Sequence, residues 1–155
     1  IMDIYLPDIK YMDADSAGSY SRAADYPQMA AAAVKEMYRQ TGNALEMDPQ
    51  AVSAGRGLII RHLVLPGCVG NSLDILDFIA RDLSPDVHLS LMSQYHPTAG
   101  TERYGPPLNR TLRPKEYAAV RYRAETLEIE NGWFQEMSSY RHYRPDFRKA
   151  HPFED

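Results

Sequence analysis

The chain has 155 residues, of which 44% are hydrophobic and 25% charged, and its formal net charge is −4. This composition is ordinary for one globular domain with a sizeable core. Acidic and basic residues are interspersed without a Lys/Arg tract, which argues against nucleic acid or an anionic membrane as a partner. The longest apolar stretch, 58–69, contains Arg61 and His62 and is too short and too charged to span a bilayer.

The number of cysteines bears on the cellular compartment of the protein and on the cofactors that it can bind. Cys68 is the single cysteine, so no internal disulfide can form, which suits a reducing cytoplasm. A cysteine-ligated iron–sulfur cluster normally needs three or four thiolates, so we expect this chain alone to bind no such cluster. The sequence begins at Ile1 inside an apolar run, and we expect it to be part of a longer protein.

The first third of the chain predicts a strand, a loop and a helix. Residues 1–12 have a strand pattern, and residues 13–25 are small and polar, as in a loop. A helix is predicted over 26–40, because apolar residues recur there at helical spacing behind a capping Asp25. Gly42 is the expected stop of this helix.

The middle of the chain repeats the same order. Residues 58–65 are almost continuously apolar, which predicts a parallel strand covered on both faces. A second helix is predicted over 73–83, capped by Asn71 or Ser72, and a third strand over 87–95.

A long Pro- and Gly-containing loop over 96–111 leads to a third predicted helix over 114–128. The alternation of strands and helices predicts an α/β fold of about three units, with parallel strands and right-handed crossovers. We assign residues 1–130 to these units and leave residues 131–155 as a tail of unassigned structure. Three units make half of a (β/α) barrel or a small open sheet, whose open edges could support an edge-to-edge homodimer.

Active sites of parallel α/β folds lie at the carboxyl ends of the strands, where this chain carries few polar residues. Asp8 and Lys10 share one face of the first strand, and an ion pair at the rim is the simplest interpretation. Arg61 and His62 lie on opposite faces of the second strand. Arg61 is suited to a carboxylate or phosphate, or to pairing with Asp8, whereas we interpret His62 as a hydrogen-bonded histidine under a helix.

Two further features follow strand ends. His96 opens the long loop after the third strand, where functional residues are frequent, although an ordinary surface histidine is equally compatible with this position. The segment 66–72 joins a strand to a helix but lacks a phosphate-binding motif, so we interpret it as a tight turn with a helix cap. Cys68 within it has no basic neighbour in sequence and is interpreted as unreactive.

Three motifs in order resemble the pyruvate formate-lyase activating branch of the radical S-adenosylmethionine (SAM) superfamily. They are Asp8-Ile9-Lys10, the strand from Ile60-Arg61 to Pro66-Gly67, and the segment Tyr95-His96-Pro97-Thr98-Ala99-Gly100. The third motif has Gln94 where proline is usual. The similarity runs from about Asp3 to Val120.

The resemblance implies the C-terminal half of a radical SAM partial (β/α) barrel. It implies contacts of Lys10, Arg61 and His96 with SAM, and a place for Asp8 near the SAM site and a monovalent cation. It further implies a 4Fe-4S cluster in the parent protein, an oxidoreductase that would cleave SAM to a 5′-deoxyadenosyl radical. The protein partner would be a glycyl radical enzyme or a related substrate. The three cluster cysteines of the family are absent from this sequence, so we expect the 155-residue chain alone to be inactive.

Two other interpretations are open at this point. A barrel aldolase or lyase could use Lys10 to form a Schiff base with a carbonyl substrate. Alternatively, the chain could be a structural fragment without a ligand of its own that associates with itself through exposed strand edges.

Overall fold

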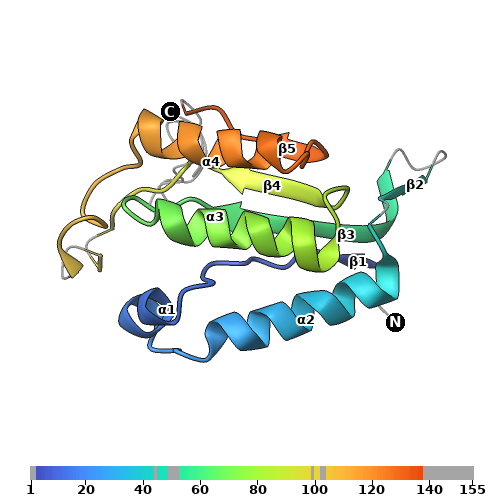
Figure 1. Ribbon diagram of the computed structural model, residues 1–155, viewed down its shortest axis with the longest axis horizontal. Helices are drawn as coiled ribbons and strands as arrows, with labels where there is room; N and C mark the ends of the chain where they lie inside the picture. The colour runs from blue at the N-terminus through green and yellow to red at the C-terminus, as the bar shows by residue number, and fades with distance from the viewer. Residues whose placement is uncertain (1–2, 44, 49–52, 99, 102–103, 138–155) are drawn as a thin grey trace, which may run out of the picture.

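The computed structural model describes residues 3–43, 45–48, 53–98, 100–101 and 104–137. Within these ranges, no helix is both long and apolar enough to cross a membrane. The elements, shown in Figure 1, are β1 (Ile4–Tyr5), α1 (Ala14–Ser21), α2 (Tyr26–Thr41), β2 (Glu46–Asp48), β3 (Ser53–Leu63), α3 (Val69–Phe78), the π-helical turn η1 (Ile79–Leu83), β4 (His88–Met92), α4 (Pro114–Thr126) and β5 (Gly132–Phe134).

The strands form an open, mostly parallel sheet. Its order is β1–β3–β4–β5, and the short β2 pairs antiparallel with β3. In the parallel part, Tyr5 lies opposite Leu58, Arg61 opposite Ser90, and Ser90 opposite Trp133. The predicted α/β class with parallel strands is therefore confirmed. The sheet is not closed into a barrel, and β1 and β5 are its outer strands.

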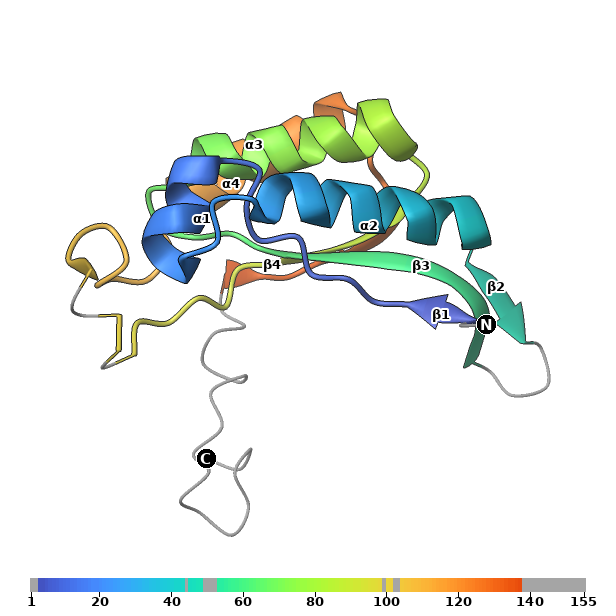
Figure 2. The ribbon, with the colours of Figure 1, turned by 90° about the horizontal axis from the view of Figure 1, so that it is seen from below.

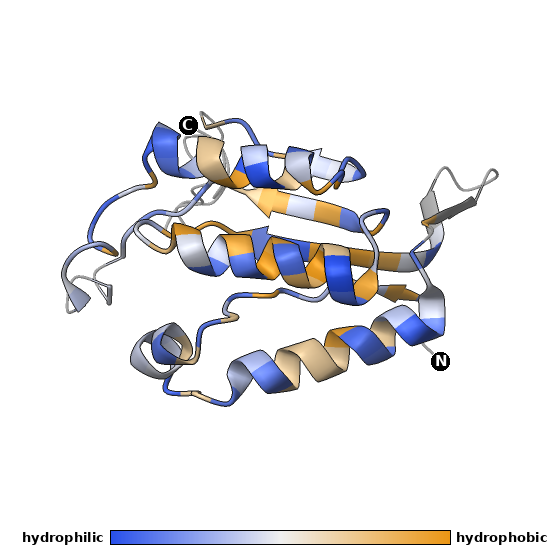
Figure 3. Ribbon diagram, in the orientation of Figure 1, coloured by the Kyte–Doolittle hydropathy of each residue, from blue (hydrophilic) through white to orange (hydrophobic). Residues whose placement is uncertain are grey.

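The helices cover one face of the sheet, as Figure 2 shows. Along β3 and its extension, Leu58, Ile60, His62 and Val64 point into this layer and are at most 1% exposed. Hydrophobic segments of β3, β4 and α3 meet there in Figure 3. The helices complete the core with Val34 from α2, Ile75 and Leu76 from α3, and Val120 and Ala124 from α4.

The opposite side of the sheet, which we call the helix-free face, is covered by none of the described helices. The apolar run 58–65 predicted a strand covered on both faces, and this is wrong for the described residues. Ile59, Leu63 and Leu65 remain partly exposed, because the described helices that connect the parallel strands all lie on the other side of the sheet. The helix-free face is formed by Asp8, Lys10, Ile59, Arg61, Leu63, Leu65, Met92, Gln94 and Trp133.

The loop predicted over 13–25 is also wrong in part, because residues Ala14–Ser21 form α1. The Asp13 carboxylate caps this helix by accepting bonds of 3.0 Å from the amides of Asp15 and Ser16. Its one fully buried residue is Ala17. A helix with such a small apolar contact leaves little hydrophobic periodicity in the sequence, which explains the error.

Two predicted boundaries shift for reasons that matter to the site. In the described part of the strand predicted over 1–12, the ladder covers Ile4–Tyr5 and is followed by a single bridge between Asp8 and Arg61. The second helix begins at Val69 rather than at residue 73, so Asn71 and Ser72, the two predicted capping residues, both lie inside it and neither caps it. The side chain of Asn71 instead bonds the backbone of residues 10–13.

The other elements match the prediction in type, although two strands differ in their bounds. The strand predicted over 58–65 runs from Ser53 to Leu63, and the strand predicted over 87–95 runs from His88 to Met92. The helices predicted over 26–40 and 114–128 correspond to α2 and α4, and Gly42 ends α2 with a φ of 71°. Asp25 occupies the position before α2, but its side chain makes no capping bond. The tail from residue 131, left unassigned, contributes β5 as the fourth parallel strand. Residues 138–155 lie outside the described residues.

Candidate functional site

Three of the four predicted site residues meet at the carboxyl ends of the strands. Asp8 follows β1, and Arg61 lies near the end of β3, at the single bridge that joins the two segments. The Asp8 carboxylate is 3.6 Å from Lys10 Nζ and 3.3 Å from Arg61 Nε. The prediction that Asp8 and Lys10 pair is thus confirmed geometrically, and Arg61 joins the same carboxylate.

The charge balance of this cluster favours an anion. Two cations share one carboxylate, so the cluster carries a surplus positive charge. All three side chains are partly exposed, at 39% for Asp8, 43% for Arg61 and 55% for Lys10. Ion pairs with this much solvent contribute little to stability. Lys10 and Arg61 consequently keep hydrogen-bonding capacity for a ligand carboxylate or phosphate.

The charged cluster borders a hollow on the helix-free face. The hollow has a volume of about 140 Å³, and Leu63, Met92 and Gln94 complete its lining beside Asp8, Lys10 and Arg61. These residues alternate along their strands, as 61 and 63 do on β3, so the pleat directs them to one side. Leu63, Met92 and Gln94 were not predicted as site residues, although this alternation in the sequence could have indicated them.

A second hollow, of about 220 Å³, adjoins the first and shares Lys10 and Leu63 with it. Its remaining lining consists of Tyr11, Leu65 and Tyr95, so it is apolar and aromatic. The two hollows together offer a charged end and an aromatic end on either side of Lys10. This arrangement suits a ligand with a carboxylate at one end and a planar or apolar group at the other.

His62 lies on the covered side of the sheet, as predicted. It is 1% exposed, and its ring nitrogens contact Ile9 O and Ser72 Oγ, each at 2.8 Å. Because a carbonyl can only accept, Nδ1 donates to Ile9 and Nε2 accepts from the Ser72 hydroxyl. Burial lowers the pKa of His62 to about 4, so the ring is neutral at pH 7. The interpretation of His62 as a hydrogen-bonded structural histidine is confirmed.

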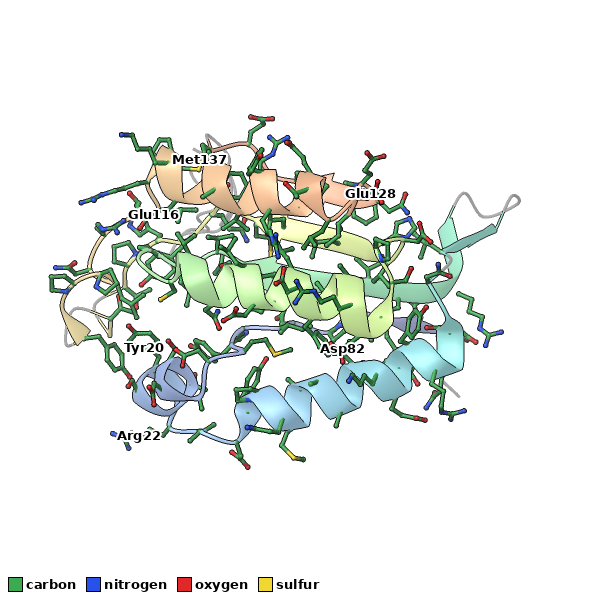
Figure 4. All side chains as sticks on the ribbon, in the orientation of Figure 1. Tyr20, Arg22, Asp82, Glu116, Glu128 and Met137 are labelled. Atoms are coloured by element: carbon green, nitrogen blue, oxygen red, sulfur yellow. The ribbon has the colours of Figure 1, made fainter. Side chains whose placement is uncertain are left out.

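The segment 66–72 contains a turn whose Gly67 amide is already hydrogen-bonded within the protein. The Gly67 amide donates to the Glu116 carboxylate at 2.8 Å, and Figure 4 shows Glu116 near the start of α4. Arg110 binds the same carboxylate with two bonds of 2.7 and 2.8 Å. The Gly67 amide therefore does not face an anionic ligand. Burial raises the pKa of the Cys68 thiol, which agrees with the interpretation of Cys68 as unreactive.

His96 lines neither of the two hollows. It is half-buried in the loop that follows β4. Its neighbour Tyr95 does line the aromatic hollow, and the Tyr95 hydroxyl donates to Leu108 O at 2.7 Å. A contact between His96 and a ligand stays a prediction.

The donor set of the chain does not fit an iron–sulfur cluster. Among the described residues, no three His, Cys, Asp or Glu side chains gather at a common point. Cys68 is the single cysteine of the full sequence, whereas such clusters require several thiolates. Comparisons with protein-family models, with curated proteins and with solved structures find no match to this chain.

Proposed function

We propose that this chain supplies part of the SAM-binding site of a radical SAM enzyme related to the pyruvate formate-lyase activating branch. The observation that supports the proposal is the meeting of Lys10 and Arg61 around Asp8, at the carboxyl ends of parallel strands and beside an aromatic hollow. Lys10 and Arg61 are two of the residues to which the sequence resemblance assigns SAM contacts, and it places Asp8 near the SAM site.

The chemistry of the two hollows is compatible with SAM. Its methionyl end carries a carboxylate, which Lys10 or Arg61 can hold by charge-assisted hydrogen bonds. Its adenine is planar and apolar on both faces, and it therefore matches the aromatic and apolar lining formed by Tyr11, Leu65 and Tyr95. Asp8 keeps the two cations close together and could accept from the methionyl ammonium group or bind a monovalent cation.

In this proposal the helix-free face is the inner face of a partial (β/α) barrel. A barrel interior receives alternate strand residues, which accounts for the partly exposed apolar side chains Ile59, Leu63 and Leu65. The thiolates of the cluster would come from outside these 155 residues. In the parent protein, SAM at a reduced 4Fe-4S cluster would supply a 5′-deoxyadenosyl radical for hydrogen abstraction from a glycyl radical enzyme or a related substrate.

The proposal is tested by calorimetric titration of the chain with SAM. Lys10→Ala and Arg61→Ala should each weaken binding about tenfold or more, because each removes a charge-assisted bond. The matched control is Lys35→Ala on α2, which removes the same charge from an exposed ion pair with Asp82. The control should bind as the unmodified chain does, whereas equal losses in all three variants would indicate a general charge effect.

The corresponding test of the reaction uses the parent gene product, purified without oxygen and with its cluster reconstituted. Addition of dithionite and SAM should yield 5′-deoxyadenosine, and Lys10→Ala should abolish it. No product despite bound SAM would contradict the proposed reaction. Schiff-base chemistry at Lys10 would then be examined by borohydride trapping with a carbonyl substrate. The structure gives Lys10 little desolvation for that role, because its side chain is 55% exposed.

A further inference from the structure

The segment that carries Asp8 and Lys10 leaves the sheet early. Its ladder with β3 ends at Tyr5, and beyond that point two backbone bonds of 2.9 Å form the bridge, from Arg61 N to Pro7 O and from Ile9 N to Arg61 O. Among the described residues, Asp8 O and the main-chain groups from Ile9 O to Asp13 N make no backbone hydrogen bond to a strand. Side chains from three other elements bond these groups instead.

Tyr26, the first residue of α2, bonds the segment on both sides of Ile9. Its hydroxyl donates to Asp8 O at 2.9 Å and accepts from Lys10 N at 3.1 Å. One hydroxyl group thereby links the two residues whose side chains face the hollow. Its ring also packs edge-on against Tyr11, with 5.7 Å between the ring centroids.

Asn71 of α3 bonds the continuation of the segment with both ends of its amide. Nδ2 donates to Lys10 O at 2.9 Å, while Oδ1 accepts from Met12 N at 2.7 Å and from Asp13 N at 3.3 Å. Asn71 is 7% exposed, so these bonds are shielded from water. Between the two main-chain groups that Tyr26 bonds, the His62 ring donates to Ile9 O.

The backbone bonds matter because the side chain of Lys10 has weak contacts of its own. It is 55% exposed, and its ion pair with Asp8 measures 3.6 Å. A pair of this kind does not hold a long, flexible side chain in one place. The position from which Lys10 reaches the hollow is consequently set by the main chain from which it projects.

We propose that Tyr26, His62 and Asn71 are positioning residues, which hold the Asp8–Lys10 segment so that Lys10 and Arg61 face the same ligand carboxylate. None of the three lines either hollow, so they act through the backbone and not by contact with the ligand. The effect that we expect these residues to have on SAM affinity rests on the proposed function. The geometry that they impose on Asp8 and Lys10 does not depend on it.

The test compares two substitutions that each delete one hydroxyl group. Tyr26→Phe removes the bonds to Asp8 and Lys10. The control, Tyr117→Phe, removes a bond of 3.2 Å to Leu91 O inside the core, away from the Lys10 segment. Calorimetric titration with SAM should show binding that is weaker by about fivefold or more for Tyr26→Phe, because the net free energy of a hydrogen bond corresponds to roughly this factor, and unchanged binding for Tyr117→Phe. Equal affinities in the two variants would overturn the proposal.

A ligand-free measurement separates this inference from the proposed function. In the unmodified chain and in Tyr117→Phe, nuclear Overhauser effects should connect main-chain protons of Asp8 with those of Arg61, which lie opposite each other in the bridge. They should weaken or vanish in Tyr26→Phe while the core methyl signals stay in place. If the unmodified chain binds no SAM but this pattern appears, the proposed function fails and the positioning role stands. If the pattern is the same in all three proteins, the positioning role is overturned whatever SAM does.

Discussion

Acidification should destabilise this fold through His62 in particular. The ring is 1% exposed and bonded on both sides, to Ile9 O and to Ser72 Oγ. Protonation would place a charge in the core and remove the acceptor that Nε2 offers to the Ser72 hydroxyl. Burial accordingly lowers the pKa of His62 from 6.5 to about 4 in the folded chain.

The sign and the size follow from proton linkage. Below pH 6.5 the unfolded chain takes up a proton at this position, whereas the folded chain resists until about pH 4. The unfolded state therefore gains relative stability as the pH falls through this window. Between pH 7 and pH 4.5, the free energy of unfolding should fall by roughly 2.5 kcal/mol from this group alone. Above pH 7 the contribution of His62 to the pH dependence should vanish.

The assay is urea denaturation from pH 7.5 to pH 4.5, with His62→Gln as the reference protein. This variant cannot titrate, and it should be less stable by about 1–3 kcal/mol at pH 7 because a buried hydrogen bond is lost. The unfolding free energy of the unmodified chain minus that of the variant should fall by about 2.5 kcal/mol between pH 7 and pH 4.5, and it should become negative where the difference at pH 7 is smaller than this. A difference that stays constant across the range would refute the assignment of a lowered pKa to His62.

Two further predictions concern single residues that join elements. Gly132→Ala should destabilise the fold by about 3 kcal/mol or more in urea denaturation, because φ is 121° and a Cβ would overlap the Leu89 backbone. Gly70→Ala, in α3 with open space around it, is the matched control and should be neutral or stabilising by up to about 1 kcal/mol. Glu116→Gln should weaken the bonds to Arg110 and lower the melting temperature at pH 7. Those bonds lower the pKa of Glu116 to about 2, so the stabilisation is present above pH 4.5 and is lost as the pH falls through about 2, where the variant and the original chain should converge.

Local sequence patterns were sufficient to predict most of the helices and parallel strands that form the core layer. The helical spacing in 26–40 and the stop at Gly42 predicted α2 within one residue of its observed end. The alternation of strand and helix predicted parallel strands, and the pleat predicted that Arg61 and His62 face opposite sides. These features depend on residues near one another in the chain, where a period of two or 3.6 is directly visible.

Features that join distant segments could not be predicted in the same way. Asn71 was expected to cap a helix, yet its amide binds residues 10–13, some sixty positions earlier in the chain. α1 was missed because its small contact with the core leaves little hydrophobic periodicity in the sequence. β5 was missed because a strand of three residues is too short to form a recognisable pattern and is defined by its pairing with β4. The sequence determined which charged residues lie at the strand ends, since that depends on strand order and pleat. Only the tertiary structure decided that the Asp8–Lys10 segment is bonded by side chains of α2 and α3, because hydrogen bonds between distant elements exist only once those elements have packed.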